Sequence, residues 1–284
     1  MANLKDIRDR IKSIKSIQQV TSAMKMVAAA KLRRSQERME QARPYADRLK
    51  QVIENLLPVV DRGILDLLQK REIKRVGFVV VTSDRGLAGS FNINVIKQAE
   101  TDIEKIGKEN VDLFCIGKKC HDHFKKRNYS IIEGHTDFWS ELQFDHAVKL
   151  GNGIISHFLN GHVDEIRVVY NWFKNVGVQE VQNEILLPLT FEEEKTHSGD
   201  KIFEPGEKEI VQSLTPRHLN IQMWKYLLES FASEQAARMV AMENATENAG
   251  EMIKSLQLEF NKARQTAITT EMLEIVGGAE ALVN

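Results

Sequence analysis

One stretch of the chain has the residue types and the position of a phosphate-binding loop. Residues 83–92 follow an apolar run and precede a helical pattern, and Gly86 and Gly89 lie three positions apart within them. Alpha/beta folds bind phosphate at such strand-to-helix turns, because the N–H groups that open the helix attract an anion. The stretch matches neither G-x-x-x-x-G-K-S/T nor G-x-G-x-x-G. We therefore expect a structural turn or a partner contact here, with nucleotide binding as the weaker alternative.

A second group contains side chains of the kind that bind zinc: Cys115, Cys120, His121 and His123. Their spacing is not that of a zinc knuckle, which also needs a second pair of ligands. Cys115 ends a predicted strand, and a free cysteine is usually a small buried hydrophobe. No Ser/His/Asp or Cys/His triad, paired-carboxylate pattern or H-E-x-x-H run stands out in the sequence. We expect no catalytic residue, no metal and no cofactor, with a metal site as the weaker alternative.

Basic residues near the N-terminus form a more specific signal. No Asp or Glu occurs between Arg10 and Gln36, so we expect these cations to lack acidic partners four positions away in a helix. Unneutralised charge of this kind favours contact with an acidic partner over a merely solvated helix face. The basic residues are Arg10, Lys12, Lys15, Lys25, Lys31, Arg33 and Arg34.

Length and composition indicate a folded protein with many exposed helix faces, since 42% of the 284 residues are hydrophobic and 28% are charged. Two cysteines in so long a chain argue against a disulfide framework and fit a reducing compartment. The net charge of −1 predicts no bulk attraction to nucleic acid or membrane. The longest apolar run, around Val76–Val81, is far shorter than the roughly 20 residues of a membrane span.

Charge is divided unevenly between the two ends of the chain. Residues 1–56 contain 13 Lys or Arg and 6 Asp or Glu, whereas residues 207–284 contain 7 and 11. Ends of opposite charge attract each other, which favours their pairing. The basic N-terminal run also has the composition of a transit peptide, a weaker alternative because the helical pattern continues well past the usual cleavage region.

Both ends carry an apolar repeat whose steps alternate between three and four residues, over residues 4–56 and 228–267. We call the positions of this repeat the seam, and its polar members include Thr21, Ser35 and Thr246. A 3.5-residue repeat held this long predicts a helix wound against another helix. We expect a long antiparallel two-helix coiled coil formed by the N- and C-terminal helices. The alternative is two amphipathic helices packed on a globular core, which the narrow stripe disfavours. For the C-terminal helix, Thr215 and Pro216 are a start signal, and Gly277 and Gly278 are a stop signal.

The middle of the chain predicts strands that alternate with helices, which is typical of an open, mostly parallel sheet. We expect a Rossmann-like α/β head at residues 73–204, inserted between coiled-coil helices at residues 1–57 and 207–284, with neither helix part of its core. A loop or hairpin is expected at residues 192–201, and a short helix around residues 207–213. The predicted strands are Val76–Val81, Val111–Ile116, 165–170 and 180–187, and the predicted helices are 92–106, Lys118–Lys126 and Phe144–Leu159.

Three stretches of the sequence resemble the gamma subunit of F-type ATP synthases of the bacterial type. The first is IKSIQQVTSAMKMVAAAK at residues 14–31, and the second is the loop at residues 82–92. The third begins ITTE at Ile268 and ends GAEA at Ala281, with that family's spacing of Ile-Thr, Glu, an acid and Gly-Ala. The resemblance covers essentially the whole chain, in order.

The resemblance implies a function as the central rotor shaft, which transmits torque between an ion-driven membrane ring and a catalytic hexamer. The paired helices would lie inside a hexamer of alternating alpha and beta subunits, and the head would meet the epsilon subunit and the membrane c-ring. Proton or sodium flow would drive rotation coupled to ATP synthesis or hydrolysis. The subunit would be non-catalytic, bind no cofactor and lie at the cytoplasmic face of the cell membrane as a peripheral protein.

The resemblance also implies which residues contact the catalytic hexamer. Some photosynthetic relatives carry a redox dithiol in an inserted segment, but Cys115 and Cys120 are not in such an insertion, so we predict no thiol control. The implied contacts are Met24, Lys25, Arg238, Arg264, Gln265, Thr269 and Glu271, to which the basic N-terminal run adds Lys31, Arg33 and Arg34.

Two other classes of function remain open from the residues alone. A coiled-coil protein that binds nucleic acid through its basic N-terminal helix would lose affinity steeply as salt is raised. A nucleotide-dependent enzyme built on the α/β head would show saturable binding of ATP or NAD.

Overall fold

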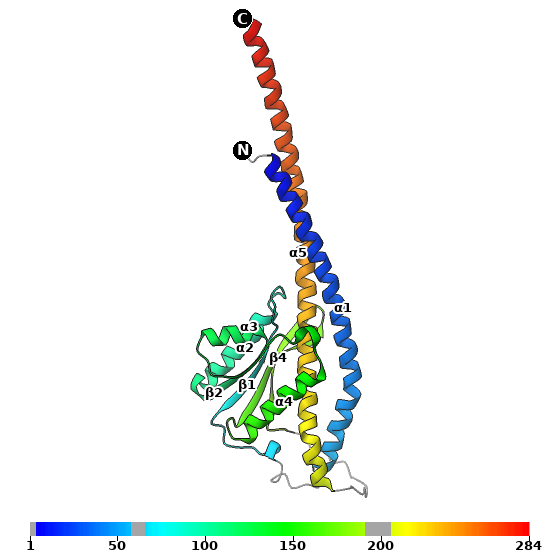
Figure 1. Cartoon of the computed structure of the whole chain (residues 1–284), viewed down its shortest axis with the longest axis vertical. Helices are drawn as coiled ribbons and strands as arrows, with labels where there is room; N and C mark the ends of the chain where they lie inside the picture. The colour runs from blue at the N-terminus through cyan, green and yellow to red at the C-terminus, as the bar shows by residue number, and fades with distance from the viewer. Residues whose placement is uncertain (1–3, 58–65, 191–205, 284) are drawn as a thin grey trace. The chain divides into compact units, whose positions relative to one another are not determined.

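The computed structural model describes residues 4–57, 66–190 and 206–283. The chain divides into two compact units, one made of Met1–Ala28 with Met239–Asn284 and the other of Ala29–Arg238. Two long helices take part in both units, α1 at Leu4–Leu56 and α5 at Glu207–Val283 (Figure 1). The loop or hairpin predicted at residues 192–201 lies outside the described residues.

The unit Ala29–Arg238 contains a five-stranded sheet with the strand order β3-β2-β1-β4-β5. The first four strands in this order are parallel, and β5 runs antiparallel to β4 at one edge. The open, mostly parallel sheet predicted from the sequence is confirmed. The strands are β1 (Val76–Val81), β2 (Val111–Ile116), β3 (Ile131–His135), β4 (Glu165–Asn175) and β5 (Val178–Leu187).

The sequence does not predict β3, and it predicts only part of β4. None of the five residues of β3 is fully buried, and the strand contains Glu133, Gly134 and His135. A short edge strand of this composition has neither an apolar run nor a clear alternation of apolar and polar residues. β4 extends past the predicted end at residue 170 because its last residues pair with β5 in a hairpin.

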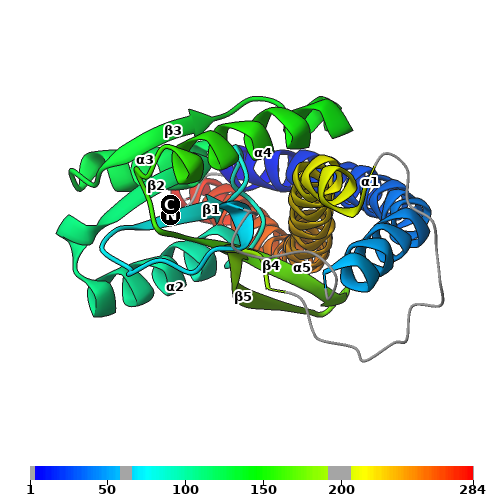
Figure 2. The same cartoon turned by 90° about the horizontal axis from the view of Figure 1, so that it is seen from below.

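Helices cover both faces of the sheet (Figure 2). α2 (Phe91–Ile106) and α3 (Lys118–Lys126) bury their apolar sides against one face, and α4 (Phe144–Leu159) buries its own against the other. All three helices are predicted from the sequence, and the predictions are confirmed. Short 3-10 turns lie at η2 (Asp66–Leu68), η3 (Lys108–Asn110) and η4 (Trp139–Glu141).

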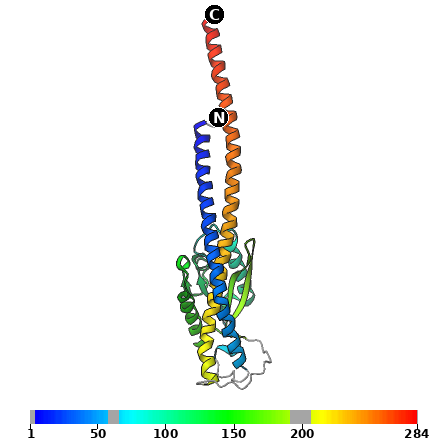
Figure 3. The ribbon, with the colours of Figure 1, turned by 90° about the vertical axis from the view of Figure 1, so that its right-hand side faces the viewer.

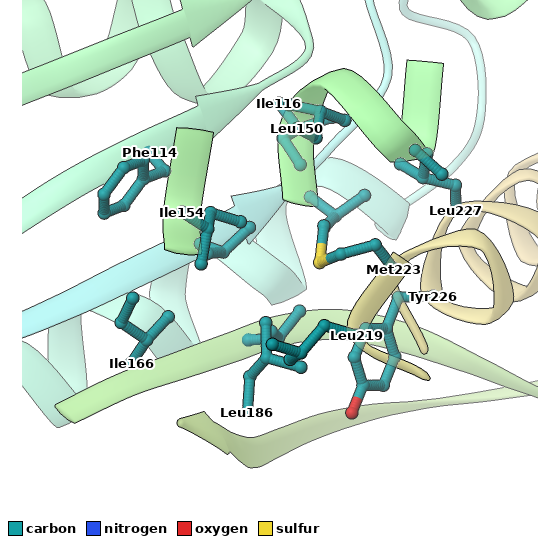
Figure 4. Packing of buried hydrophobic residues seen from close by; sticks show 14 of the residues in the cluster. Phe114, Ile116, Leu150, Ile154, Ile166, Leu186, Leu219, Met223, Tyr226 and Leu227 are labelled. Carbon is teal, nitrogen blue, oxygen red and sulfur yellow. The ribbon is translucent and has the colours of Figure 1, made fainter. Parts of the chain in front are cut away.

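The first part of α5 lies on the same face of the sheet as α4 (Figure 4). Leu219, Met223 and Leu227 are at most 1% exposed and pack in one cluster with Leu150 and Ile154 of α4. Burial of a side chain of this size contributes about 1.5–3 kcal/mol. The expectation that neither long helix belongs to the core of the head is therefore wrong, because this segment of α5 completes the core.

α5 also begins earlier and ends later than its sequence signals predict. It starts at Glu207 and includes the segment expected to be a separate short helix, and Pro216 lies inside it. Thr215 is 2% exposed and its hydroxyl donates to the carbonyl of Val211, so it is an interior residue and not an N-cap. The helix continues through Gly277 to Val283, beyond the predicted stop.

The predicted coiled-coil positions are confirmed. In the unit of Met1–Ala28 with Met239–Asn284, α1 and α5 pair with buried Ile7, Ala28, Ile253 and Leu256 along their seam (Figure 3). The polar seam residues also pair, since the hydroxyls of Thr21 and Thr246 are 2.8 Å apart. In the unit Ala29–Arg238, the hydroxyl of the seam residue Ser35 donates to the carbonyl of Leu228 at 3.1 Å.

Candidate partner-contact surfaces

The loop at residues 83–92 is tied together by an acidic side chain. One carboxylate oxygen of Asp84 accepts the backbone N–H of Lys118, and the other accepts that of Asp137, at 2.8 and 2.9 Å. Asp84 therefore joins the segments that follow β1, β2 and β3 at the carboxyl end of the sheet. A carboxylate at this position repels a phosphate, so the geometry favours the structural turn over nucleotide binding. Leu87, at the turn, has φ of 62° and is 64% exposed.

The two cysteines are interior residues of the sheet and its covering helix. Cys115 and Cys120 are both 0% exposed, and the Cys120 sulfur lies 3.3 Å from the carbonyl oxygen of Ile116. The hydrogen bond with Cys120, together with burial, raises the pKa of the Cys115 thiol. A thiol with a raised pKa is a poor nucleophile and a poor metal ligand. The nearby His123 is paired elsewhere, because its Nε2 lies 2.8 Å from Glu100 Oε1.

Three of the predicted basic contact residues of α1, namely Lys31, Arg33 and Arg34, lie in the unit Ala29–Arg238, and their surroundings differ. Arg33 donates to the carboxylate of Glu37 at 3.1 Å, one turn further along the helix. The expectation that these cations lack acidic partners four positions away is therefore wrong for Arg33, because Glu37 lies just past the acid-free run. Arg34 is exposed, and Lys31 is half-buried close enough to Glu234 to affect its ionisation.

Arg238 is held inside the unit Ala29–Arg238 and is not a free surface cation. Its guanidinium lies 2.6 Å from Glu234 Oε1, and the two side chains are 12% and 7% exposed. A second N–H of Arg238 donates to the carbonyl of Gly86 at 3.2 Å. Burial raises the pKa of the Glu234 carboxyl, and Arg238 opposes that rise. This contact joins α5 to the loop at residues 83–92, a link that sequence spacing alone does not reveal.

A set of buried polar groups also joins α5 to the sheet. The hydroxyls of Tyr170 and Tyr226 donate to the two carboxylate oxygens of Glu184, at 2.7 and 3.0 Å. Burial raises the pKa of both tyrosines, and it also raises the pKa of the nearby Glu229. Both hydroxyls thus stay protonated as hydrogen-bond donors, which fixes Tyr226 of α5 against β5.

In the other unit, the predicted N-terminal contact residues lie at the helix pair. The Lys25 ammonium pairs with the carboxylate of Glu243 on α5, and both side chains remain about two-fifths exposed, at 39% and 42%. Met24 is half-buried. Lys25 therefore neutralises an acid of the partner helix while it keeps part of its surface open to solvent.

The predicted C-terminal contact residues lie on exposed turns of α5. Arg264, Gln265, Thr269 and Glu271 are all exposed. Two of them are joined within the helix, where the hydroxyl of Thr269 donates to the carbonyl of Gln265 at 2.9 Å. Among the described residues, every position from 268 to 279 is exposed, so this end of α5 extends past α1 as a single helix (Figures 1 and 3).

The exposed end of α5 also carries large apolar side chains that the motif does not single out. Met272, Leu273, Ile275 and Val276 are 66%, 67%, 71% and 61% exposed. An exposed apolar surface of this kind marks an interaction site. The signal that could have revealed it is length, since the C-terminal repeat and the apolar residues that follow it extend past the point where α1 can reach.

These features define a class of protein in which two long helices pair in one unit and pack with an α/β sheet in the other, with exposed surfaces suited to partner chains. No helix in the described part of the chain is both long and apolar enough to cross a bilayer. The family model described as ATP synthase matches residues 3–282.

Two curated relatives, both named ATP synthase gamma chain, align with this chain over essentially their whole length. The ATP synthase gamma chain of Prosthecochloris aestuarii is 50% identical over 291 residues, covering 99% of each chain. That of Chlorobium luteolum is 48% identical over 290 residues and covers 100% of each. The chain belongs to the ATP synthase gamma chain family.

Solved structures show the same fold at lower identity. A chain of the Euglena gracilis mitochondrial ATP synthase matches with a TM-score of 0.69 at 20% identity, covering 98% of this chain and 94% of its own length. A chain from the central stalk and c-ring of the Tetrahymena thermophila mitochondrial ATP synthase matches with a TM-score of 0.63 at 24% identity, covering 80% and 99%.

Proposed function

We propose that this chain is the central rotor shaft of an F-type ATP synthase. It transmits torque between the ion-driven c-ring of the membrane and the catalytic hexamer of alpha and beta subunits, and so couples proton translocation to ATP synthesis or hydrolysis. The observation that carries the proposal is the end of α5, where positions 268–279 are exposed and rich in apolar side chains. A lone helix of about 12–15 residues is marginal in water, so such an end needs a surrounding partner.

The shaft is proposed to be a non-catalytic subunit without a cofactor, peripheral at the cytoplasmic face of the cell membrane. We assign the coiled coil to residues 1–57 and 207–284 and the head to residues 73–204, with the head's core completed by the first part of α5. The epsilon subunit and the c-ring would bind at the head. Ion pairs between exposed cations of α1 and acidic residues of the hexamer would be weak and reversible, since an exposed ion pair contributes about 0–1 kcal/mol to stability. The proposed contacts to the hexamer are Met24, Lys25, Lys31, Arg33, Arg34, Arg238, Arg264, Gln265, Thr269 and Glu271.

The proposal is tested by watching the head move against an immobilised hexamer. Both native cysteines are buried, so a cysteine introduced at the exposed position Lys97 of α2 is the one that a maleimide-linked bead would label. We expect the bead to turn in one direction when ATP is added to the complex, and to stop when ATP is exhausted. A complex that hydrolyses ATP while the bead on Lys97→Cys stays still, in a preparation where the label is intact, contradicts the proposal.

A further inference from the structure

A groove in the unit Ala29–Arg238 runs along α1, between that helix, the η4–α4 segment and α5. It consists of three adjoining cavities of about 550, 400 and 100 Å³. The first two share Phe144 and Trp224 in their walls, and the last two share Arg38. On α1 the lining runs from Lys31 to Tyr45, a length of about 21 Å at 1.5 Å per residue. We call this feature the α1–α4–α5 groove.

The floor of the groove is aromatic and exposed. Tyr45 is 58% exposed and Phe144 is 45% exposed. The rings of Phe144 and Trp224 meet edge to face with their centroids 5.9 Å apart, and Ala42 on α1 lines the same two cavities as these rings. Aromatic side chains that stay accessible in a concave surface are typical of the core of a protein interface.

The walls of the groove carry positive charge. Lys31, Arg34 and Arg38 line one end, and Arg217 lines the other, while no Asp or Glu lines any of the three cavities in the described part of the chain. Arg38 donates one N–H to the carbonyl of Leu142 at 2.9 Å, which holds its guanidinium at the wall. Its remaining N–H groups suit a carboxylate, which guanidinium binds in a two-pronged geometry.

We propose that the α1–α4–α5 groove binds an amphipathic, acidic α-helix of another protein chain, about four turns long. The apolar stripe of that helix packs on Tyr45, Phe144 and Trp224, and its carboxylates meet the cluster of Lys31, Arg34 and Arg38. A free helix of this length is largely unfolded in water, so binding folds the segment as it docks. The inference goes beyond the rotor function but shares Lys31 and Arg34 with the proposed hexamer contacts. The tests use the chain without the hexamer, so their failure would leave the rotor function standing.

The first test uses two synthetic peptides and the full-length chain. Both peptides have about 15 residues and the same apolar stripe, but one carries Glu at its polar positions and the other Lys. Fluorescence anisotropy gives the dissociation constants, and circular dichroism gives the helix content. We expect the acidic peptide to bind at least about tenfold more tightly than the basic one and to gain helicity on binding. Equal affinity for both, or no saturable binding of either, overturns the proposal.

The second test changes the groove. The double variant Arg34→Glu/Arg38→Glu is expected to reverse the preference between the peptides, whereas Arg43→Glu, which alters an exposed arginine paired with Asp47 outside the lining, is expected to leave it unchanged. Phe144→Ser is expected to weaken the acidic peptide by about tenfold, with thermal unfolding used to show that the fold is kept. If Phe144→Ser instead dissolves a dimer of the chain and leaves peptide binding intact, the groove's occupant is a second copy and the proposal fails.

Discussion

At the scale of single residues, His218 illustrates how burial decides protonation. It is 4% exposed, and burial, aided by the nearby charge of Lys50, lowers the pKa of its imidazole to about 4. The folded chain therefore keeps this side chain neutral at pH values where the unfolded chain, with a usual pKa near 6.5, binds a proton. Proton binding by His218 in the unfolded chain, but not in the folded chain, lowers the free energy of unfolding. The contribution of neutral His218 to stability is therefore fully present above pH 6.5 and is lost as the pH falls towards 4.

This difference predicts an acid-sensitive step in stability. Between pH 7 and pH 4, His218 alone should lower the free energy of unfolding by on the order of 3 kcal/mol. Urea unfolding at a series of pH values would measure it. His218→Gln should flatten the curve in this window, while His162→Gln, at an exposed position, should leave it steep. A wild-type curve that is already flat between these pH values contradicts the prediction.

The Arg238–Glu234 pair gives a second prediction at this scale. Arg238→Ala leaves the Glu234 carboxylate buried without its closest cation, a change that costs about 3–5 kcal/mol in comparable buried pairs. The double change Glu234→Gln/Arg238→Ala should cost less, because it buries no unpaired charge. Chemical unfolding compares the two, with the exposed Arg43→Ala as the control. A single variant no less stable than the double one would show that the pair is not coupled.

At the scale of elements, the sequence predicts helices that carry a regular apolar repeat and strands that are uniformly apolar. The 3.5-residue pattern locates both long helices, and buried runs such as Val76–Val81 locate the central strands, because in each case many residues support the same secondary-structure assignment. The pattern fails where tertiary contacts decide. Pro216 and Gly277 carry local stop or start signals, yet both lie within α5, where the surrounding helix outweighs a single unfavourable residue.

The division of α5 between two roles is likewise invisible in the pattern. Around Met223 and Leu227 the helix is apolar on several sides, because it faces both α1 and the sheet, and the seam pattern accounts for only one of these faces. The contact residues on the last turns of α5 could be proposed only from a motif, since exposed polar side chains leave no periodic signal. Arg238 is the converse case, because the resemblance implies that it contacts the hexamer, whereas in the structure it pairs with Glu234 one turn earlier in α5.

The shared core predicts the outcome of cutting out the head. A fragment of residues 73–204 keeps α4 but lacks Leu219, Met223 and Leu227, so the part of the core that α5 covers would be exposed to water. We expect it to bind a hydrophobic dye and aggregate, whereas a longer fragment that links residues 29–204 to 207–238 should unfold cooperatively. Dye fluorescence and thermal unfolding of both fragments check this. A monomeric 73–204 fragment with a sharp transition would show that α5 is dispensable to the head.

At the scale of the whole molecule, the proposed shaft must bind its partners without being fixed to them. Ion pairs such as Arg33–Glu37 and Lys25–Glu243 keep the chain's own charges partly neutralised while they remain exposed. Ion pairs that the same exposed side chains make with partner chains would also be weak. They can form and break within a rotation cycle, because each exposed ion pair contributes only about 0–1 kcal/mol. In the proposed shaft, the exposed apolar side chains at the end of α5 would supply the lasting attraction to a surrounding partner.

The polar residues at the end of α5 should therefore matter for rate more than for assembly. Arg264 and Gln265 are exposed and lie about one turn after Phe260, whose ring centroid is 5.6 Å from the Arg8 guanidinium of α1. We expect Arg264→Ala/Gln265→Ala to leave the complex with normal subunit stoichiometry, since the apolar side chains of this end are untouched. ATP turnover or its coupling to ion flow should fall several-fold, the equivalent of roughly 1 kcal/mol in the rate-limiting barrier. Purified complexes would be compared by subunit composition, ATP hydrolysis and ion pumping, with Glu259→Gln/Lys262→Gln as an exposed control pair on the preceding turns. Unchanged turnover, or a complex that does not assemble, would contradict a role in state-dependent contacts.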